Sequence, residues 1–177
     1  NLTAPFWFVG ERDGVAIVEA GAGTGANAKT TASAKAMTNA RTSENAATVT
    51  YAELERRTAA NAERLPKRPG KSVGLLLCAN ETSAISIYLA ALRAGHALML
   101  LDAGMHRELL GGIIENYDPD WIAAPDGTAL GEFAGRYQCG KEIRGEFDVW
   151  ERRARERQAT EPHPELALLL ATSGTTG

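Results

Sequence analysis

"KSVGLLLCANETSAISIYLAALRAGHALMLLD" (residues 71–102) contains two apolar runs with a longer patterned segment between them. The first run, residues 73–78, is nearly unbroken, which is typical of a strand covered on both faces in a parallel sheet. Residues 83–95 are apolar almost all round and stop at a glycine, so they predict a buried helix that Asn80 caps. Residues 96–102 supply the next strand. The order of strand, helix and strand predicts a right-handed crossover between parallel neighbours.

The same alternation continues downstream. Residues 106–117 have apolar side chains at helical spacing and predict an amphipathic helix, and residues 120–125 predict the strand after it. Residues 165–171, "ELALLLA", predict one more buried strand. We therefore expect an α/β fold, in which a parallel sheet is flanked by helices.

A further helix is predicted upstream, ending at Pro66. Thr50 and Glu53 have the spacing of a capping box, in which each side chain bonds a backbone N–H at the start of the helix. Five side chains at helical spacing fall near one face of it: Tyr51, Leu54, Thr58, Asn61 and Leu65.

Other parts of the chain have weaker patterns. Residues 5–10 and 14–20 are short aromatic or β-branched runs that predict strands at a sheet margin. Residues 21–46 are almost all Ala, Gly, Thr, Asn and Ser, so they bury too little surface to offset their ordering entropy, and we expect a flexible insertion. Between residues 126 and 164 the pattern fits either an edge strand around Phe147 to Trp150 or a solvated helix. Its arginines are expected to form a solvated face.

Composition excludes several classes of protein. The 177 residues are 44% hydrophobic, which suits one ordinary packed domain. With 19 basic and 22 acidic side chains, the net charge of −3 provides no field that would collect nucleic acid or anionic lipid. Cys78 and Cys139 lack zinc-ligand spacing, and we expect buried or inert thiols in a cytoplasmic protein. No apolar run is long enough to span a membrane, and no signal peptide is predicted.

A first glycine-rich loop, residues 18–30, resembles two nucleotide-binding signatures, but each lacks a feature that the corresponding site requires. Residues 21–26 fit the dinucleotide pattern G-x-G-x-x-G/A, but a polar segment follows where a crossover helix is required. Residues 23–30 fit the Walker A pattern except that Ala28 stands where a glycine must wrap the backbone around phosphate. We expect no nucleotide role for this loop. The rival hypothesis, a P-loop NTPase, predicts that Lys29→Ala abolishes nucleotide binding.

A second loop follows the last predicted strand. It offers hydroxyl donors and backbone N–H groups without bulky side chains, which is chemistry suited to a triphosphate and a magnesium ion. Its residues are Thr172, Ser173, Gly174, Thr175, Thr176 and Gly177.

Three stretches together resemble the adenylate-forming superfamily, which includes acyl-CoA synthetases, adenylation domains of nonribosomal peptide synthetases, and luciferases. "LALLLATSGTTG" (residues 166–177) is similar to the family's phosphate loop, T-S-G-[ST]-T-G-x-P-K-G. "TVTYAELERRTAANAERL" (residues 48–65) is similar to an early motif around T-Y-x-E-L, and "LAALRAGHALMLLDA" (residues 89–103) to L-K-A-G-x-A-Y-V-P-L-D. Order and approximate spacing agree as well.

The resemblance implies a ligase that uses ATP and magnesium to convert a small carboxylic acid into an acyl-adenylate. The acyl group then passes to a thiol, of coenzyme A or of a phosphopantetheine carrier protein. Thr172 is implied as the metal-proximal hydroxyl, and residues 173–177 as phosphate ligands. The x-P-K-G continuation, the adenine-binding segment and the lid with its catalytic lysine are missing, so no catalytic residue can be named.

We therefore expect residues 1–177 to be a partial N-terminal AMP-binding subdomain of a longer enzyme, inactive in adenylation by itself. The alternative is a standalone nucleotide-binding or interaction module, for which a stop codon after Gly177 is expected. Outside the loop, His96, His106 and His163 share no ligand or triad spacing, and we expect capping or packing roles for them. Asp102, at the end of a predicted strand, is expected to cap the next helix.

Overall fold

The computed structural model describes residues 13–19, 47–79, 81–128, 130, 133, 135–143, 146–153 and 162–170. The predicted strand at residues 5–10 and the predicted insertion at 21–46 lie outside this part of the chain. The chain divides into two compact units, residues 1–54 and 55–177. No helix in the described part is long and apolar enough to cross a membrane.

The first unit contains a two-stranded antiparallel sheet and the start of a helix. β1 (Val15–Glu19) pairs with β2 (Ala47–Thr50), and α1 (Tyr51–Ala62) begins directly after β2. The Glu53 backbone N–H donates to Thr50 Oγ1 at 3.2 Å, which confirms the cap predicted at Thr50. The sequence indicated β1 but not β2, because four residues are too few to display an alternating pattern.

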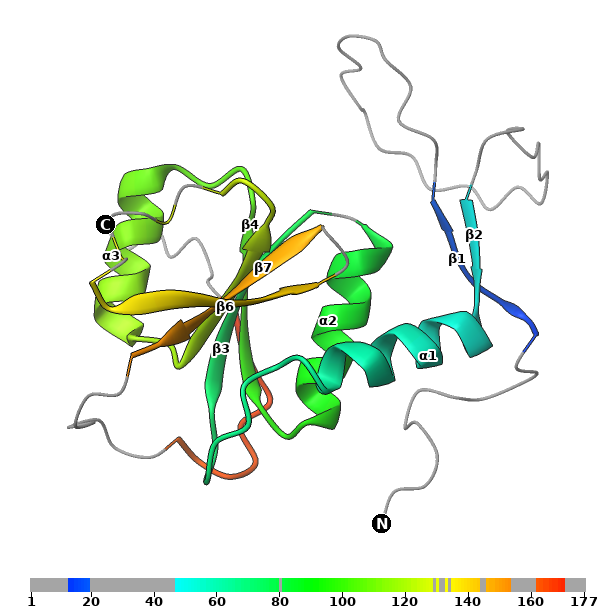
Figure 1. Ribbon diagram of the computed structural model, residues 1–177, viewed down its shortest axis with the longest axis horizontal. Coiled ribbons are helices and arrows are strands. Elements are labelled where there is room, and N and C mark those ends of the chain that lie inside the picture. The colour runs from blue at the N-terminus through cyan, green and yellow to red at the C-terminus, as the bar shows by residue number, and fades with distance from the viewer. Residues whose placement is uncertain are drawn as a thin grey trace, which may run out of the picture. The chain divides into compact units, whose positions relative to one another are not determined.

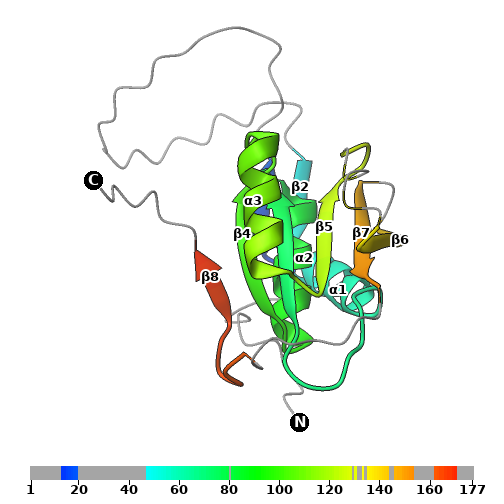
Figure 2. The same ribbon diagram turned by 90° about the vertical axis from the view of Figure 1, so that its left-hand side faces the viewer.

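The second unit is built on a six-stranded sheet, in the order β6-β7-β5-β3-β4-β8. The strands overlap in the view of Figure 1, and Figure 2 shows β8, β4, β5, β7 and β6 in this order across the sheet. The strands are β3 (Val73–Cys78), β4 (Ala97–Asp102), β5 (Trp121–Pro125), β6 (Tyr137–Ile143), β7 (Phe147–Arg152) and β8 (Leu168–Leu170). β5, β3, β4 and β8 are parallel, as predicted, but β7 runs antiparallel to both β5 and β6. The sheet is therefore mixed, because the short β6–β7 connection permits only an antiparallel hairpin.

The sheet position of β7 corrects the sequence-based alternatives for residues 126–164. Residues 147–152 form a strand, as one of the two alternatives predicted, but this strand lies between β5 and β6 and not at an edge of the sheet. Phe147 and Val149 are buried on one face, while Asp148 and Trp150 are half-buried on the other. This is the two-residue period of a strand, which the surrounding charged residues disguise.

Two helices cover opposite faces of the sheet, as Figure 2 shows, with α3 toward the viewer. α2 (Thr82–Arg93) packs through Ile87 and its neighbours against one buried cluster that includes Leu76. α3 (Arg107–Tyr117) packs through Leu110 and Ile114 against a second cluster that includes Leu75 and Leu77. Successive β3 side chains thus face different helices, and the predicted arrangement of a sheet flanked by helices is confirmed.

The predicted faces of the helices are largely confirmed, but the upstream helix ends at Ala62 and not at Pro66. Four of the five side chains predicted on one face of the upstream helix are buried: Leu54, Thr58, Asn61 and Leu65. α2 ends as expected, since Gly95 has φ +80° and its N–H donates to Leu92 O at 3.0 Å. Its N-cap is Glu81, which makes no side-chain cap bond, and Asn80 lies outside the described residues. On α3, Leu109 and Tyr117 are exposed, so its apolar stripe is wider than the surface it buries.

Candidate functional site

The parallel strands bring three segments to one edge of the sheet. Cys78 at the end of β3 is in register with Asp102 at the end of β4, and Leu170 at the end of β8 pairs with Leu100. Parallel strands end at the same side of a sheet, and this side is where open α/β folds place ligands. We call the ends of β3, β4 and β8, with the turns that follow β3 and β4, the carboxyl edge.

The turn after β4 is held by Asp102. Its Oδ1 accepts a hydrogen bond from Gly104 N at 2.6 Å, and its backbone carbonyl accepts one from Met105 N at 3.0 Å. The expectation that Asp102 caps the next helix is wrong, because the N-cap of α3 is His106. The turn inserts Ala103 to Met105 between the strand and the helix, so the carboxylate closes an Asx-type turn instead.

The thiol of Cys78 also lies at the carboxyl edge. Its Sγ is 3.5 Å from Leu101 O, and burial, followed by the nearby Asp102 carboxylate, raises the pKa of the thiol. It therefore stays protonated near neutral pH and is a poor nucleophile, as predicted. Cys139 on β6 forms no disulfide either, but it is exposed rather than buried.

The beginnings of two helices face this edge, since α2 follows β3 and α3 follows β4. A helix N-terminus carries partial positive charge and free N–H groups, which favour anions. In the first turn of α2, Ser83 Oγ lies 3.3 Å from Glu81 Oε2. Sequence reasoning did not draw on these helix ends, although the strand–helix order already implied them.

The residues predicted to bind phosphate, Thr172 to Gly177, lie outside the described residues. The first glycine-rich loop also lies outside them from residue 20 onward, and this part includes Lys29. The strand that leads to the phosphate-binding segment is described. β8 pairs in parallel with β4, yet Leu170 is 65% exposed, so the predicted burial of this strand is wrong. Only one neighbouring strand covers β8 within the described part of the sheet, which accounts for its exposure.

His96 has the packing role that we expected, whereas His106 and His163 are exposed and the His106 side chain makes no cap hydrogen bond. His96 is buried just before β4, and its Nδ1 accepts a hydrogen bond from Trp121 Nε1 at 3.2 Å. His106 is the N-cap residue of α3, and the exposed His163 accepts at Nδ1 from Glu165 N at 3.3 Å. Within the described residues, no group of three or more His, Cys, Asp and Glu side chains is arranged to hold a metal ion.

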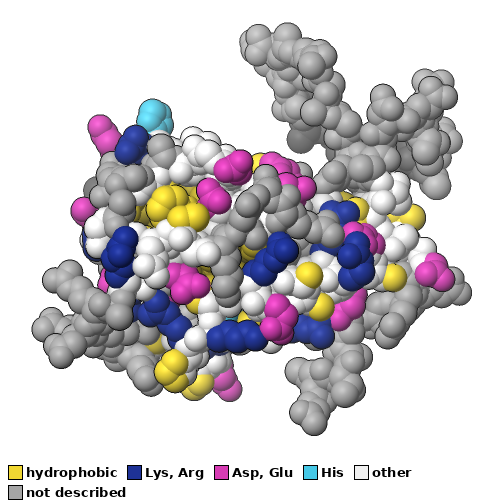
Figure 3. Space-filling view, viewed as in Figure 1, with side chains coloured by type: hydrophobic (Ala, Val, Ile, Leu, Met, Phe, Trp, Pro, Cys, Tyr) yellow, Lys and Arg dark blue, Asp and Glu magenta, His cyan; other side chains and the backbone are white. Residues whose placement is uncertain are grey.

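Charge on the surface is mixed. On the face shown in Figure 3, Lys and Arg side chains are interspersed with Asp and Glu. This distribution agrees with the small net charge of −3. Neither positive nor negative charge therefore dominates that face.

The family model for AMP-binding enzymes matches residues 25–177, which is most of the chain. This chain belongs to the AMP-binding enzyme family. The family predicted from the three sequence motifs is thereby confirmed. Among curated proteins no sequence matches the chain.

Parts of two solved structures are similar to parts of the chain. Apo MatB from Rhodopseudomonas palustris is 22% identical over 51% of this chain and 18% of its own, with a TM-score of 0.46. VinN in complex with L-aspartate is 27% identical over 50% of this chain and 25% of its own, with a TM-score of 0.41. This member of the AMP-binding enzyme family thus spans about a quarter or less of the length of either.

Proposed function

We propose that this chain is the N-terminal part of an AMP-forming ligase that activates a small carboxylic acid with ATP and transfers the acyl group to a thiol. The observation that carries this proposal is the family match over residues 25–177, which includes the Thr172–Gly177 segment. The acceptor thiol is that of coenzyme A or of a phosphopantetheine carrier protein. The free cysteines are consistent with a cytoplasmic enzyme.

Thr172 to Gly177 are proposed to bind the β- and γ-phosphates of ATP. Two observations support this role. β8 is parallel to β4, so the chain leaves β8 toward the carboxyl edge. Leu170 pairs with Leu100 of β4. Thr172 follows Leu170 by two positions in the sequence, as Asp102 follows Leu100. N–H and hydroxyl donors aimed at the departing phosphates stabilise the charge that develops on them.

Thr172 is also proposed to lie next to the magnesium ion that accompanies ATP. Magnesium prefers hard oxygen ligands and takes several of them from phosphates and water, so one hydroxyl is a sufficient protein ligand. Asp102 supplies a carboxylate at the carboxyl edge, but its Oδ1 already accepts from Gly104 N. When bound, the ion neutralises negative charge on the phosphates.

Two displacements make up the proposed reaction. A carboxylate oxygen of the acid attacks the α-phosphorus of ATP, the bond from that phosphorus to the bridging oxygen breaks, and pyrophosphate leaves. The thiol then attacks the acyl carbon of the acyl-adenylate, loses its proton, and displaces AMP. We expect residues 1–177 alone to catalyse neither step.

The test is ATP–pyrophosphate exchange by the enzyme encoded by the whole reading frame that contains this chain, with a panel of carboxylic acids. Thr172→Ala should lower the exchange rate by about a hundredfold, because one donor to the transferred phosphates is lost. Thr48→Ala, at an exposed threonine of β2, is the matched control and should leave the rate unchanged.

Three outcomes would overturn parts of this proposal. Equal rates for the two variants would remove Thr172 from the site, and absence of acid-dependent exchange would remove the ligase activity. A stop codon directly after Gly177, in place of x-Pro-Lys-Gly, would favour a standalone module. Exchange catalysed by residues 1–177 alone would refute the expected inactivity of the fragment.

A further inference from the structure

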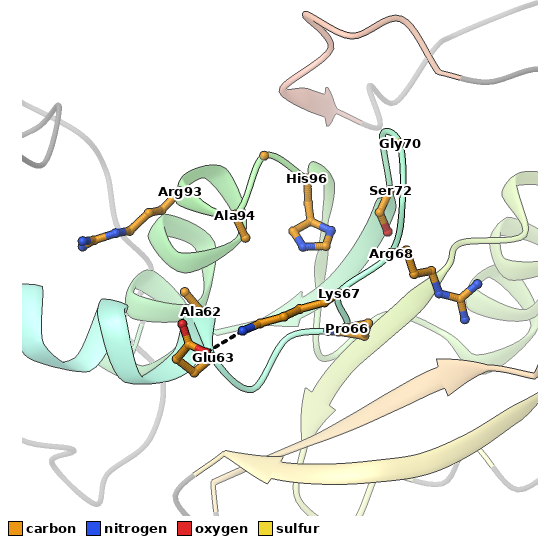
Figure 4. Close-up of a pocket in the computed structure, with 11 residues that line it drawn as sticks. Ala62, Glu63, Pro66, Lys67, Arg68, Gly70, Ser72, Arg93, Ala94 and His96 are labelled. Atoms are coloured by element: carbon orange, nitrogen blue, oxygen red, sulfur yellow. Dashed lines mark hydrogen bonds and ion pairs between the residues drawn. The ribbon is translucent and has the colours of Figure 1, made fainter. Parts of the chain in front are cut away.

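A cavity lies at the opposite end of the strands from the carboxyl edge. Its volume is about 390 Å³, and Ser72 and His96, which directly precede β3 and β4, line it together with residues of the turn after α1 (Figure 4). We call it the amino-edge cavity; its polar lining consists of Glu63, Lys67, Arg68, Ser72, Arg93 and His96. A strand of six residues, such as β3, separates the two edges by about 20 Å.

We propose that the amino-edge cavity binds a small phosphomonoester, at a site separate from that of ATP. Lys67, Arg68 and Arg93 line it, and each of them pairs with a carboxylate, so the anion is expected to be held by directed donors and not by net charge. This site is independent of the proposed ligase reaction and goes beyond it.

Lys67 is the cation that can turn to a ligand. Its Nζ lies 2.6 Å from Glu63 Oε2, but the two side chains are 71% and 75% exposed. Such an exposed pair contributes little stability, so the ammonium can exchange the carboxylate for a phosphate at small cost.

The two arginines act differently. Arg68 donates to Arg152 O at 2.7 Å, and Arg93 forms an ion pair with Glu55. Figure 4 shows both guanidinium groups turned away from the His96 ring. Arg68 also forms an ion pair with Asp120 at 3.8 Å, so both arginines are paired with carboxylates. They contribute aliphatic walls and are not expected to contact the ligand directly.

Ser72 provides the observation that points to a ligand. The residue is 4% exposed, and its Oγ has no hydrogen-bond partner among the described residues. Its backbone carbonyl, in contrast, accepts from Ala97 N at 2.8 Å. Burial removes the water that hydrated the hydroxyl, and without a partner no new hydrogen bond replaces it. Most buried hydroxyls are therefore hydrogen-bonded. The Oγ atom itself has almost no accessible surface, so a phosphate oxygen in the cavity would supply the missing partner once the side chain rotates about its Cα–Cβ bond.

His96 offers a second donor. Because Nδ1 accepts from Trp121 Nε1, the neutral ring must carry its proton on Nε2. Burial lowers the pKa of His96, nearby Lys71 adds to this effect and Asp120 opposes it, so the ring is neutral near pH 7. Nε2–H is then the one side-chain donor that this residue can present to a ligand.

The size of the cavity favours an ester over free phosphate. About 390 Å³ is more than one phosphate fills, and it falls within the range of small-molecule sites. Ala62, Pro66 and Ala94 also line the cavity and offer apolar contacts to a short organic group. The phosphate group would accept from the Ser72 hydroxyl, His96 Nε2–H and the Lys67 ammonium.

The probe is glycerol 3-phosphate, titrated into the 177-residue chain and followed by NMR signals of the His96 ring and by calorimetry. We expect saturable binding of one molecule, weaker binding of inorganic phosphate and none of glycerol. Lys67→Gln and Ser72→Ala should each weaken binding about tenfold, the usual effect of losing one hydrogen bond to a charged group. Arg64→Gln removes the same charge as Lys67→Gln from a residue outside the lining, and should leave binding unchanged.

Several results would overturn the proposal. One is absence of saturable binding, and another is equal weakening by Lys67→Gln and Arg64→Gln, which would indicate a general charge effect. Without ligand, Ser72→Ala should be at least as stable as the parent chain, and marked destabilisation would mean that the hydroxyl already has a partner. Thr172→Ala should not affect binding, so a loss in that variant would place the probe at the carboxyl edge.

Discussion

Gly74 on β3 is in register with Trp121 on β5, and its missing side chain makes room for the indole ring. A Cβ added at Gly74 would lie 2.1 Å from Trp121 Cζ2 and 2.2 Å from Cε2, more than 1 Å inside ordinary contact distance. Gly74→Ala must therefore displace a fully buried ring that also donates to His96. Overpacking costs about 1–3 kcal/mol and the strained hydrogen bond about 1 kcal/mol more, so we expect destabilisation of about 2–4 kcal/mol.

The assay is urea unfolding of the parent chain, Gly74→Ala, Trp121→Leu and the double variant. Trp121→Leu removes the ring atoms that the new methyl group would meet, so the cost of Gly74→Ala should fall by at least about 1 kcal/mol in that background. Gly112→Ala is the matched control, since a Cβ at this position of α3 meets nothing within 4 Å, and it should be neutral or stabilising. An equal cost of Gly74→Ala in both backgrounds would refute the steric explanation.

Three further predictions concern charge, protonation and capping. Arg152→Met should destabilise the 55–177 unit by about 3–5 kcal/mol in urea unfolding, because it removes an ion pair from Asp120, which is 2% exposed; adding Asp120→Asn should recover part of the loss. Burial lowers the pKa of His96 in the folded chain, so on acidification the unfolded chain takes up the proton first. The free energy of unfolding should therefore fall as the pH drops below about 6.5. His96→Gln should make the free energy of unfolding depend less on pH, as measured by unfolding at a series of pH values. Thr50→Ala should cost about 1 kcal/mol in thermal unfolding followed by circular dichroism, whereas Thr48→Ala, without a cap to remove, should cost less.

The central elements of the fold could be predicted because their signals are local. The apolar runs that became β3, β4 and β5 alternate with helical patterns, and this order alone implies parallel strands. β6 was not predicted, and for β7 a strand and a solvated helix stayed open, because the burial of Phe147 and Val149 depends on pairing with β5 and β6.

The candidate site was less accessible to sequence reasoning. The motif at Thr172–Gly177 indicated phosphate binding by its residue types, and the family match supports the same conclusion. The role of Asp102 was misjudged, because it depends on the backbone position of Gly104, which no pattern reveals. The amino-edge cavity could not be foreseen at all, since Ser72 and His96 meet only when β3 and β4 pair.

β8 gives the carboxyl edge a property of its own. It holds to the sheet through three residue pairs with β4, whereas β3 and β4 share six. Elements with few pairings open first, so the amides of β8 should exchange with solvent through local opening long before those of β3. Any molecule held by the segment after β8 would then slow this exchange. The rate of amide hydrogen exchange in β8 should therefore show whether a molecule is bound to the segment that follows it.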